Sequence, residues 1–541
     1  MSHRSLSFLA FFCAFLGLMF FLSRLNQTNE EVSGRDIIKT SHSGSRGKDT
    51  LDSKEIFGSN IASNQDNKKK LESFPFFQTL NDLTFGFDSE DQMKIFLETA
   101  ESNGLLVVSR IPALLSIRVR VIDTGRALSA LNENEKFPEI DYNHPVSAPR
   151  MVETGRENGF LGSAAEWLGA PEGRFNWGNG VKVAVLDSGV DINSLHLSSF
   201  NLEEISLIPK KSTQAYGHGT AVSSIIAGQT KDRLGIAPSA AILSIRVLND
   251  SGIGDSFTVA NGIVTAVNKG ADLINLSLGG YEESRVLQNA VNYAYENGVV
   301  VVAAAGNDGL NQVSFPARYK NVLGVGAVDV NGRSSTFSNH GEGVDLSAPG
   351  LEVHAAWEED EMVLFSGTSS ATAFVTGAMA ALLSDNSGMT GEDAKNLLFQ
   401  YANEAEKPGF DKWTGHGTLN LGRVLSRDIA GIHDAALVGY YFAPEDLLTA
   451  GHIGTVPFLV SVQNQGTSWI NSLKLEVLYK GLKREFLLGN LEPGKTRSEQ
   501  LYIEGEHGKG GIEIVSKVTI IGESDANPDN NVRKSRLSFA D

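Results

Sequence analysis

The chain has 541 residues, of which 41% are hydrophobic and 20% are charged, a composition typical of globular proteins and a length that suits three or four domains. The formal net charge of -18 disfavours nucleic acid and anionic membrane surfaces as partners, so we expect no nucleic-acid binding. The single cysteine, Cys13, excludes an intrachain disulfide.

An apolar segment opens the chain. Residues 1–25 carry only two charged side chains, Arg4 and Arg24. This pattern predicts an export signal, with a length between that of a signal peptide and that of a membrane anchor. Because no small-x-small cleavage site follows directly, we expect a membrane anchor that leaves the rest of the chain outside the cytoplasm; the alternative is a cleaved signal peptide and secretion. Residues 26–72 are rich in Ser, Asn, Asp and Lys and predict a disordered linker.

A small α+β unit is predicted over residues 73–145. Ser89 and Gln92 form a capping-box pattern ahead of apolar residues at helical spacing. Strands are expected over residues 105–108, 117–121 and 139–142, with a short helical piece near 127–132. This order predicts a compact βαββαβ unit of the ferredoxin-like type.

Strands and helices alternate through residues 155–426. Apolar, β-branched runs predict strands over residues 182–186, 241–247, 272–276, 298–303 and 322–328, and helices are predicted over 258–269 and 282–296. Runs that barely alternate between apolar and polar residues indicate strands buried on both faces, and therefore a parallel sheet covered by helices. In such α/β folds, functional side chains gather at the carboxyl ends of the strands.

Three short motifs occur in the order D-S-G, H-G-T and G-T-S-S-A, and they contain Asp187, His218 and Ser369. Asp187 ends a predicted buried strand, whereas His218 and Ser369 each open an apolar helical run. Taken one at a time, each residue has a plainer interpretation, as a turn former or a helix cap. Together, the motifs resemble the signature segments of the subtilisin-like serine proteases.

That resemblance implies a subtilisin-like α/β fold and an acyl-transfer mechanism. Ser369 would attack a peptide carbonyl, His218 would take its proton, and Asp187 would orient the imidazole. The segment A-A-A-G-N-D-G resembles the part of the family that stabilises the oxyanion, so Asn307 is the candidate donor through its side-chain amide. As an alternative, an Asn in a Gly-rich loop is often only a turn residue.

The resemblance also implies a cleft that binds an extended protein or peptide substrate as an added strand. The residues that resemble its binding edges and walls are Gly252, Gly254, Ser277, Leu278, Gly279, Ala304 and Gly306. Residues 303–306 themselves carry no charge, so we expect a broad pocket for apolar side chains. No cofactor and no specific metal site are expected; structural calcium is possible, although the loop over 229–233 is shorter than the family's common calcium loop.

The unit over residues 73–145 resembles the propeptide of these proteases. The resemblance implies that it assists folding, blocks the cleft as an intramolecular inhibitor and is then cut off. We expect the cut between Asn143 and Gly159, at a bond that the sequence does not identify. The alternative is a small independent domain without an inhibitory role.

Residues 430–541 change in character to strands. These are predicted over residues 456–462, 473–479, 486–488, 499–503 and 512–521, with turns at N-Q-G and E-P-G. Their spacing predicts an immunoglobulin-like β-sandwich that resembles adhesion-type bacterial modules. The Asp/Asn run over 525–531 lacks the closing Gly and Glu of a calcium loop and is interpreted as a turn.

Two functions from different classes follow from this sequence. The first is an exported serine endopeptidase that is made as a propeptide-inhibited precursor. The second is a binding or scaffold protein in which the protease fold is weak or inactive and the C-terminal sandwich carries the function. The presence of Asp187, His218, Ser369 and Asn307 favours the endopeptidase.

Overall fold

The computed structural model describes residues 82–537, apart from residues 124, 128–138, 151, 153–158, 192–193, 195, 198–201, 210–216, 231–232, 359–360, 386–387, 442–454 and 505–511. The predicted N-terminal export segment and linker lie outside the described residues, as does most of the helical piece near 127–132. Within the described ranges, none of the helices has both the length and the apolar character needed to cross a membrane.

A four-stranded antiparallel sheet and the helix α3 form most of the first described domain. Its elements are β1 (Asp82–Gly86), α3 (Glu90–Thr99), β2 (Leu105–Ile111), β3 (Ser116–Val121) and β4 (Glu139–Tyr142), and the strand order is β2-β3-β1-β4. The side chain of Ser89 accepts a hydrogen bond from the backbone N–H of Gln92, so α3 begins where the capping pattern predicts. The helix and the three strands predicted here are therefore confirmed.

A seven-stranded parallel sheet forms the centre of the next region, in the order β15-β14-β13-β12-β6-β10-β7. Its strands are β6 (Lys182–Asp187), β7 (Leu202–Ser206), β10 (Ala241–Arg246), β12 (Leu273–Leu276), β13 (Val300–Ala304), β14 (Val322–Val328) and β15 (Leu346–Pro349). The five predicted strands are confirmed. The two edge strands, β7 and β15, are additional.

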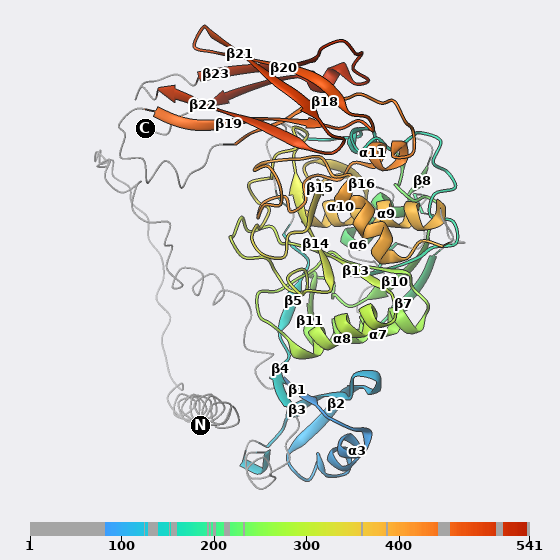
Figure 1. Cartoon of the computed structure of the whole chain (residues 1–541). Coiled ribbons are helices and arrows are strands. Elements are labelled where there is room, and N and C mark those ends of the chain that lie inside the picture. Colours follow the sequence, from blue (N-terminus) through green and yellow to red (C-terminus); the bar gives the residue numbers. More distant parts are fainter. Residues whose placement is uncertain are drawn as a thin grey trace, which may run out of the picture. The chain divides into compact units, whose positions relative to one another are not determined.

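Helices cover both faces of this sheet (Figure 1). One hydrophobic cluster joins the sheet to α6 (Gly217–Ala227) and α9 (Thr368–Asp385), and another joins it to α7 (Ser256–Asn268) and α8 (Arg285–Glu296). Shorter elements complete the region: β5 (Pro145–Ser147), α5 (Ala164–Trp167), β8 (Gln229–Thr230), β9 (Arg233–Leu234), β11 (Ile253–Asp255), β16 (Val353–Ala356), β17 (Met362–Phe365), α10 (Gly391–Gln400) and α11 (Leu421–Ser426). The α/β prediction is confirmed.

Two antiparallel sheets form the C-terminal region, with strand orders β18-β19-β22 and β21-β20-β23-β24. Their strands are β18 (Ala435–Tyr441), β19 (Thr455–Asn464), β20 (Ile470–Tyr479), β21 (Leu482–Leu491), β22 (Thr496–Glu504), β23 (Ile512–Ile520) and β24 (Val532–Leu537). Side chains from both sheets share one hydrophobic cluster, which gives the region its own core. All five predicted strands are confirmed, whereas β18 and β24 are additional; the immunoglobulin-like assignment stays a prediction.

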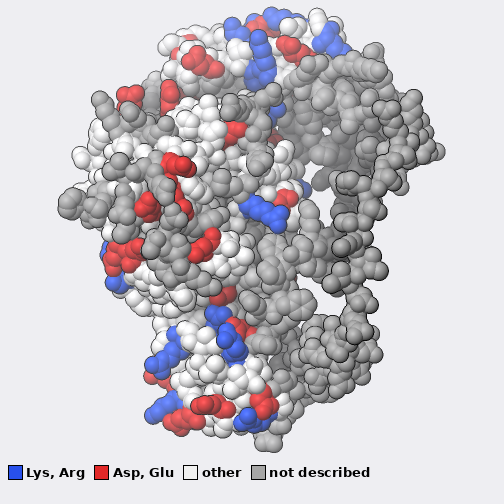
Figure 2. Space-filling view, turned by 180° about the vertical axis from the view of Figure 1, so that it is seen from behind, with Lys and Arg blue, Asp and Glu red and all other residues white. Residues whose placement is uncertain are grey.

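Charged side chains are mixed on the molecular surface. On the face in Figure 2, acidic and basic residues lie interspersed among uncharged ones, and neither kind forms a continuous field over the described residues.

Arg423 connects the helical region to the C-terminal sheets. This side chain is 7% exposed and donates hydrogen bonds to the backbone carbonyls of Tyr401, Ala402 and Gln465. Burial lowers the pKa of Arg423 to about 10, against the attraction of Asp434. Burial also raises the pKa of Asp434, to about 6, although Asn530 donates a hydrogen bond to its carboxylate.

The raised pKa of Asp434 predicts a pH-dependent stability. Because the folded-state value lies above the unfolded value, the stabilising contribution is complete below about pH 4 and is lost as the pH rises through about 6. In a Ser369→Ala background, which prevents self-digestion, Asp434→Asn should raise the free energy of unfolding at pH 8 by up to about 3 kcal/mol and leave it unchanged at pH 4. Urea unfolding at both pH values measures this difference. An equal effect at both pH values, or the same gain in the exposed control Asp529→Asn, would contradict it.

Candidate active site

Asp187 is the last residue of β6, near the middle of the parallel sheet. Its side chain is 1% exposed, and its Oδ1 accepts a hydrogen bond of 2.7 Å from the backbone N–H of Ser188. The apolar residues of β6 bury this strand on both faces, so the carboxylate is presented at the carboxyl edge of the sheet, as expected for an α/β site.

His218 lies in the first turn of α6 and faces Asp187. Its Nδ1 is 2.9 Å from each carboxylate oxygen of Asp187, and its ring packs edge-on against Phe365. Gly219 permits this approach, because a Cβ at that position would lie 2.1 Å from the carbonyl oxygen of Gly189. A larger residue would push the helix, and the imidazole with it, away from the carboxylate.

Ser369 is the second residue of α9, where the sequence places it at a helix N-terminus. Its Oγ is 3.2 Å from Nε2 of His218, and both side chains are 1% exposed. Because the carboxylate of Asp187 can only accept, the imidazole donates from Nδ1, which leaves Nε2 to accept from the hydroxyl. The structure thus brings the three predicted residues together, in an arrangement that can remove a proton from an alcohol.

Asn307 lies beside this chain of groups, and Thr368 fixes its amide. The side-chain oxygen of Asn307 accepts hydrogen bonds from the backbone N–H and the hydroxyl of Thr368, at 2.9 and 2.8 Å. Its Nδ2 therefore points the other way and donates to the carbonyl oxygen of Arg150, at 3.0 Å. Gly367 leaves room for this amide, since a Cβ there would lie 2.6 Å from the Nδ2.

The loop that carries Asn307 is held by Asn339, a residue that sequence reasoning did not single out. The side-chain oxygen of Asn339 accepts from the backbone N–H groups of Asp308 and Leu310, each at 3.0 Å. Its amide donates to the hydroxyl of Tyr281, which in turn donates to the carboxylate of Asp308. Burial and this carboxylate raise the pKa of Tyr281. Thr368 was also missed as a partner of Asn307, although it lies inside the G-T-S-S-A motif.

Three of the predicted binding-edge glycines, Gly252, Gly254 and Gly279, lie beside the segment over residues 145–148. Gly279 exchanges two backbone hydrogen bonds with Ser147, each 2.9 Å long. On the other side, β11 pairs with β5, so that Gly254 lies opposite Val146, and Gly252 accepts a hydrogen bond from the N–H of Ala148. The segment over residues 145–148 is therefore held between two backbone edges as an added strand.

The other predicted wall residues lie behind these edges. The hydroxyl of Ser277 donates to the carbonyl of Ser369 at 3.3 Å, and the N–H of Gly306 donates to the hydroxyl of Thr368 at 3.2 Å. Leu278 is fully buried in the cluster that also contains Val146, and Ala304 is 1% exposed. In the described part of the chain, no group of three His, Cys, Asp or Glu side chains is placed to hold a metal ion.

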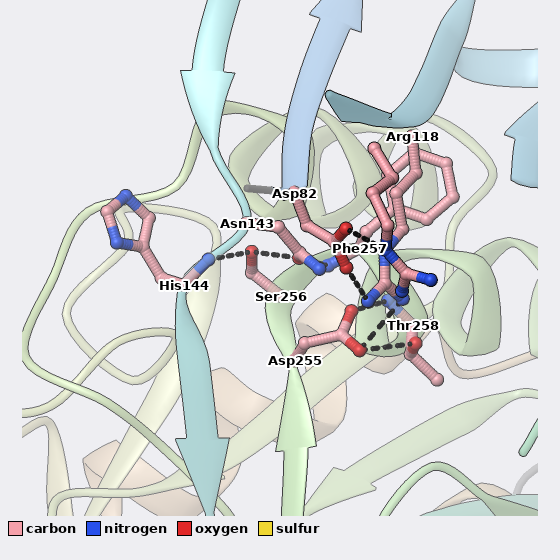
Figure 3. A network of polar contacts seen from close by, with 9 residues as sticks. Asp82, Arg118, Asn143, His144, Asp255, Ser256, Phe257 and Thr258 are labelled. Carbon is pink, nitrogen blue, oxygen red and sulfur yellow. Dashed lines mark hydrogen bonds and ion pairs between the residues drawn. The ribbon is translucent and has the colours of Figure 1, made fainter. Parts of the chain in front are cut away.

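The N-terminal domain contacts the start of α7 through charged groups (Figure 3). Arg118 of β3 pairs with Asp82 of its own domain at 2.7 Å and with Asp255 at 3.0 Å. Asp255 is the N-cap of α7, and its side chain accepts from the backbone N–H of Thr258. The ion pair therefore joins the small sheet to a helix cap of the larger region.

The chain leaving β4 also binds helix starts. Oδ1 of Asn143 accepts from the backbone N–H of Phe257 and the hydroxyl of Ser256, as Figure 3 shows. Asp141 accepts a hydrogen bond of 2.9 Å from the N–H of Arg285, the first residue of α8. Two helices thus obtain partners for N–H groups that have none within the helix.

Comparisons with known proteins agree with this geometry. Residues 178–417 match the model of the subtilase family. The chain is 32% identical over 349 residues to an alkaline protease of Shouchella clausii, covering 62% of this chain and 89% of that protein. It is 40% identical over 246 residues to thermitase of Thermoactinomyces vulgaris, covering 44% of this chain and 85% of that protein. The crystal structure of the epidermin leader peptide processing serine protease of Staphylococcus aureus has a TM-score of 0.54 and 23% identity, covering 65% of this chain and 99% of that one.

Proposed function

Because this chain belongs to the subtilase family and is a serine endopeptidase, we propose that Asp187, His218 and Ser369 are its catalytic triad. The observation that carries the proposal is the position of one imidazole, 2.9 Å from a buried carboxylate and 3.2 Å from a hydroxyl at a helix N-terminus. A histidine that only capped a helix would not be expected to contact both a buried carboxylate and a serine hydroxyl.

The proposed reaction is acyl transfer. Ser369 Oγ attacks the carbonyl carbon of a peptide bond while Nε2 of His218 takes the hydroxyl proton, and Asp187 holds the resulting imidazolium. The negative oxygen of the tetrahedral intermediate accepts hydrogen bonds from Nδ2 of Asn307 and from the backbone N–H of Ser369. His218 then passes the proton to the leaving amine. Water repeats the sequence on the acyl-enzyme and releases the second product.

We further propose that the N-terminal α+β domain is an intramolecular inhibitor. The segment that follows it lies between the two backbone edges where a substrate strand would bind, and its Arg150 carbonyl contacts Asn307. The ion pair between Arg118 and Asp255 and the contacts of Asn143 hold the domain on the protease. These contacts favour an inhibitory role over an independent domain, because a domain without an inhibitory role would not need its C-terminal segment to occupy the proposed substrate-binding site.

The enzyme is proposed to act outside the cytoplasm, either anchored in the membrane or secreted. The support is the apolar segment over residues 1–25, which lies outside the described residues. Cell fractionation with an antibody against the C-terminal region measures where the chain accumulates. Recovery in the cytoplasmic fraction alone would contradict export.

Labelling with a serine-directed phosphonate tests the endopeptidase against the scaffold alternative. The mature protein should gain one covalent adduct, located on Ser369 by peptide mass spectrometry, and should hydrolyse an unstructured protein such as casein. The control Ser370→Ala should label as the wild type does. A folded, mature wild-type protein that neither labels nor hydrolyses would favour the scaffold function.

Asn307→Ala should lower kcat by about 10² to 10³ and change KM little, because the lost donor acts on the oxyanion more than on the bound substrate. Steady-state kinetics on a chromogenic peptide provide the measurement. Asn311→Ala, an exposed position in the same loop, is the matched control and should keep wild-type kinetics. An unchanged kcat in Asn307→Ala would show that the amide is only a turn-forming group.

A further inference from the structure

Two side chains connect the loop that carries Asn307 to the edge where a substrate strand would bind. Tyr281 lies after β12, Asn307 after β13 and Asn339 after β14, and these three strands are neighbours in the parallel sheet. We propose that Tyr281 and Asn339 are positioning residues, which fix the oxyanion donor of Asn307 relative to a substrate strand bound along residues 277–280. This inference rests on the proposed function.

Asn339 holds the loop on both sides of Asn307. Before Asn307, the carbonyl of Ala305 accepts a hydrogen bond of 3.2 Å from Nδ2 of Asn339, and the carbonyl of Gly306 accepts one of 2.9 Å from its backbone N–H. After Asn307, Oδ1 of Asn339 accepts from two backbone N–H groups at 3.0 Å, the first of which is that of Asp308. Asn339 is fully buried, so water cannot readily replace these partners.

The loop also packs closely on the amide of Asn339. Gly306 has a φ of 110°, and a Cβ at this position would lie 2.3 Å from Nδ2 of Asn339. A displacement of that amide would therefore move the backbone directly before Asn307. Thr368 orients the side-chain amide of Asn307, whereas Asn339 determines where its backbone lies.

Tyr281 connects this loop to the substrate edge. Its hydroxyl accepts a hydrogen bond of 2.9 Å from Nδ2 of Asn339 and donates to the carboxylate of Asp308, the residue after Asn307. Its backbone lies two residues after Gly279, which exchanges two hydrogen bonds with the added strand. Burial and the carboxylate of Asp308 raise the pKa of Tyr281, so the hydroxyl keeps its proton and remains a donor at neutral pH.

These contacts couple substrate binding to the oxyanion donor. A strand bound at Gly279 fixes the edge, the edge fixes the ring of Tyr281, and the hydroxyl fixes Asp308. Binding energy from substrate residues that lie far from the scissile bond can then lower the barrier of the chemical step. A tyrosine that only supported the fold would not change how kcat depends on substrate length.

Tyr281→Phe removes the hydroxyl and keeps the ring. It should lower kcat about tenfold and change KM less than about twofold, because a donor displaced by about 1 Å can cost up to about 10²-fold. Steady-state kinetics of the mature chain on a chromogenic tetrapeptide measure this, with active sites counted by the phosphonate label. Tyr295→Phe, at an exposed tyrosine of α8, is the matched control and should keep wild-type kinetics. An unchanged kcat in Tyr281→Phe would overturn the inference.

Double-mutant cycles show whether both residues act through Asn307. In the wild-type background, Asn339→Ala should lower kcat by about 10- to 10²-fold, because it releases the loop on both sides. In the Asn307→Ala background, Asn339→Ala and Tyr281→Phe should each change kcat less than about twofold, because the donor that they position is gone. Full additional losses in that background would assign both residues to the fold and refute the inference. Urea unfolding in the Ser369→Ala background checks folding, and Tyr281→Phe decides if Asn339→Ala does not fold.

Substrate length tests the coupling to the edge. In the wild type, kcat should be higher for a chromogenic tetrapeptide than for the dipeptide that shares its last two residues, and Tyr281→Phe should reduce this ratio at least about threefold. An equal ratio in both proteins would contradict the coupling. A wild type that does not hydrolyse either peptide would refute the proposed function as well, whereas an active wild type with a normal Tyr281→Phe would refute the inference alone.

Discussion

Replacing Ser369 with alanine should lower kcat for peptide hydrolysis by about 10⁶-fold, the size measured for loss of the corresponding serine in subtilisin. The hydroxyl lies 3.2 Å from Nε2 of His218, and within the proposed triad it is the group that forms the acyl bond. Residual hydrolysis should come from the oxyanion donors and substrate binding. The decisive measurement is kcat on a chromogenic peptide, with the variant supplied as the mature chain.

The neighbouring serine is the control for this variant. Ser370 lies on the same helix turn and donates its hydroxyl to the carbonyl of Pro349, away from His218. Ser370→Ala should therefore keep kcat within a few-fold of the wild type. If both alanine variants lost activity equally, the loss would reflect disturbed packing of α9 and not the missing nucleophile.

Asp187→Asn should lower kcat by about 10⁴-fold at neutral pH without unfolding the protein. An asparagine can place a donor N–H against Nδ1 of His218, which favours the tautomer whose proton sits on Nε2. That nitrogen then cannot accept the proton of Ser369. Kinetics on the same chromogenic peptide measure the loss, and thermal unfolding checks the fold.

Asp272→Asn is the matched control, because it changes a carboxylate at the other end of the same strand pair. Asp272 accepts a hydrogen bond from the N–H of Lys182, the first residue of β6, and so lies at the edge of the sheet opposite Asp187. This variant should keep the wild-type kcat. A comparable loss in both variants would mean that the effect of Asp187→Asn comes from the strand and not from the imidazole.

Sequence patterns predicted those elements of the fold that depend mainly on neighbouring residues in the chain. The five buried strands of the parallel sheet are apolar, β-branched runs. Because they are buried on both faces, each can be recognised in the sequence without knowledge of its neighbouring strand. β7 was not predicted because, with Glu203 and Glu204, it carries the charges that an edge strand tolerates. β15 was not predicted because its four residues, L-S-A-P, are buried but contain no β-branched run and end in proline.

The residues of the proposed active site also divide into those that lie in local motifs and those that depend on long-range contacts. Asp187, His218 and Ser369 each lie in a short motif, so the sequence alone could suggest them as a catalytic triad. Asn339 lies in no such motif, and its role depends on a loop 31 residues earlier in the chain, to which it supplies two hydrogen bonds. The hydrogen bond from Asn307 to the carbonyl of Arg150 also joins distant parts of the chain, and no local pattern encodes it.

Arg423 sets a limit on how this enzyme can be shortened. Its guanidinium is enclosed at a seam, with two of its carbonyl partners in the helical region and the third, that of Gln465, in the C-terminal sheets. A chain ended after α11 would keep the guanidinium of Arg423 and lose the carbonyl of Gln465 as one of its acceptors. Deleting the C-terminal sheets would therefore expose the guanidinium of Arg423 to solvent and leave one of its N–H groups without its protein acceptor.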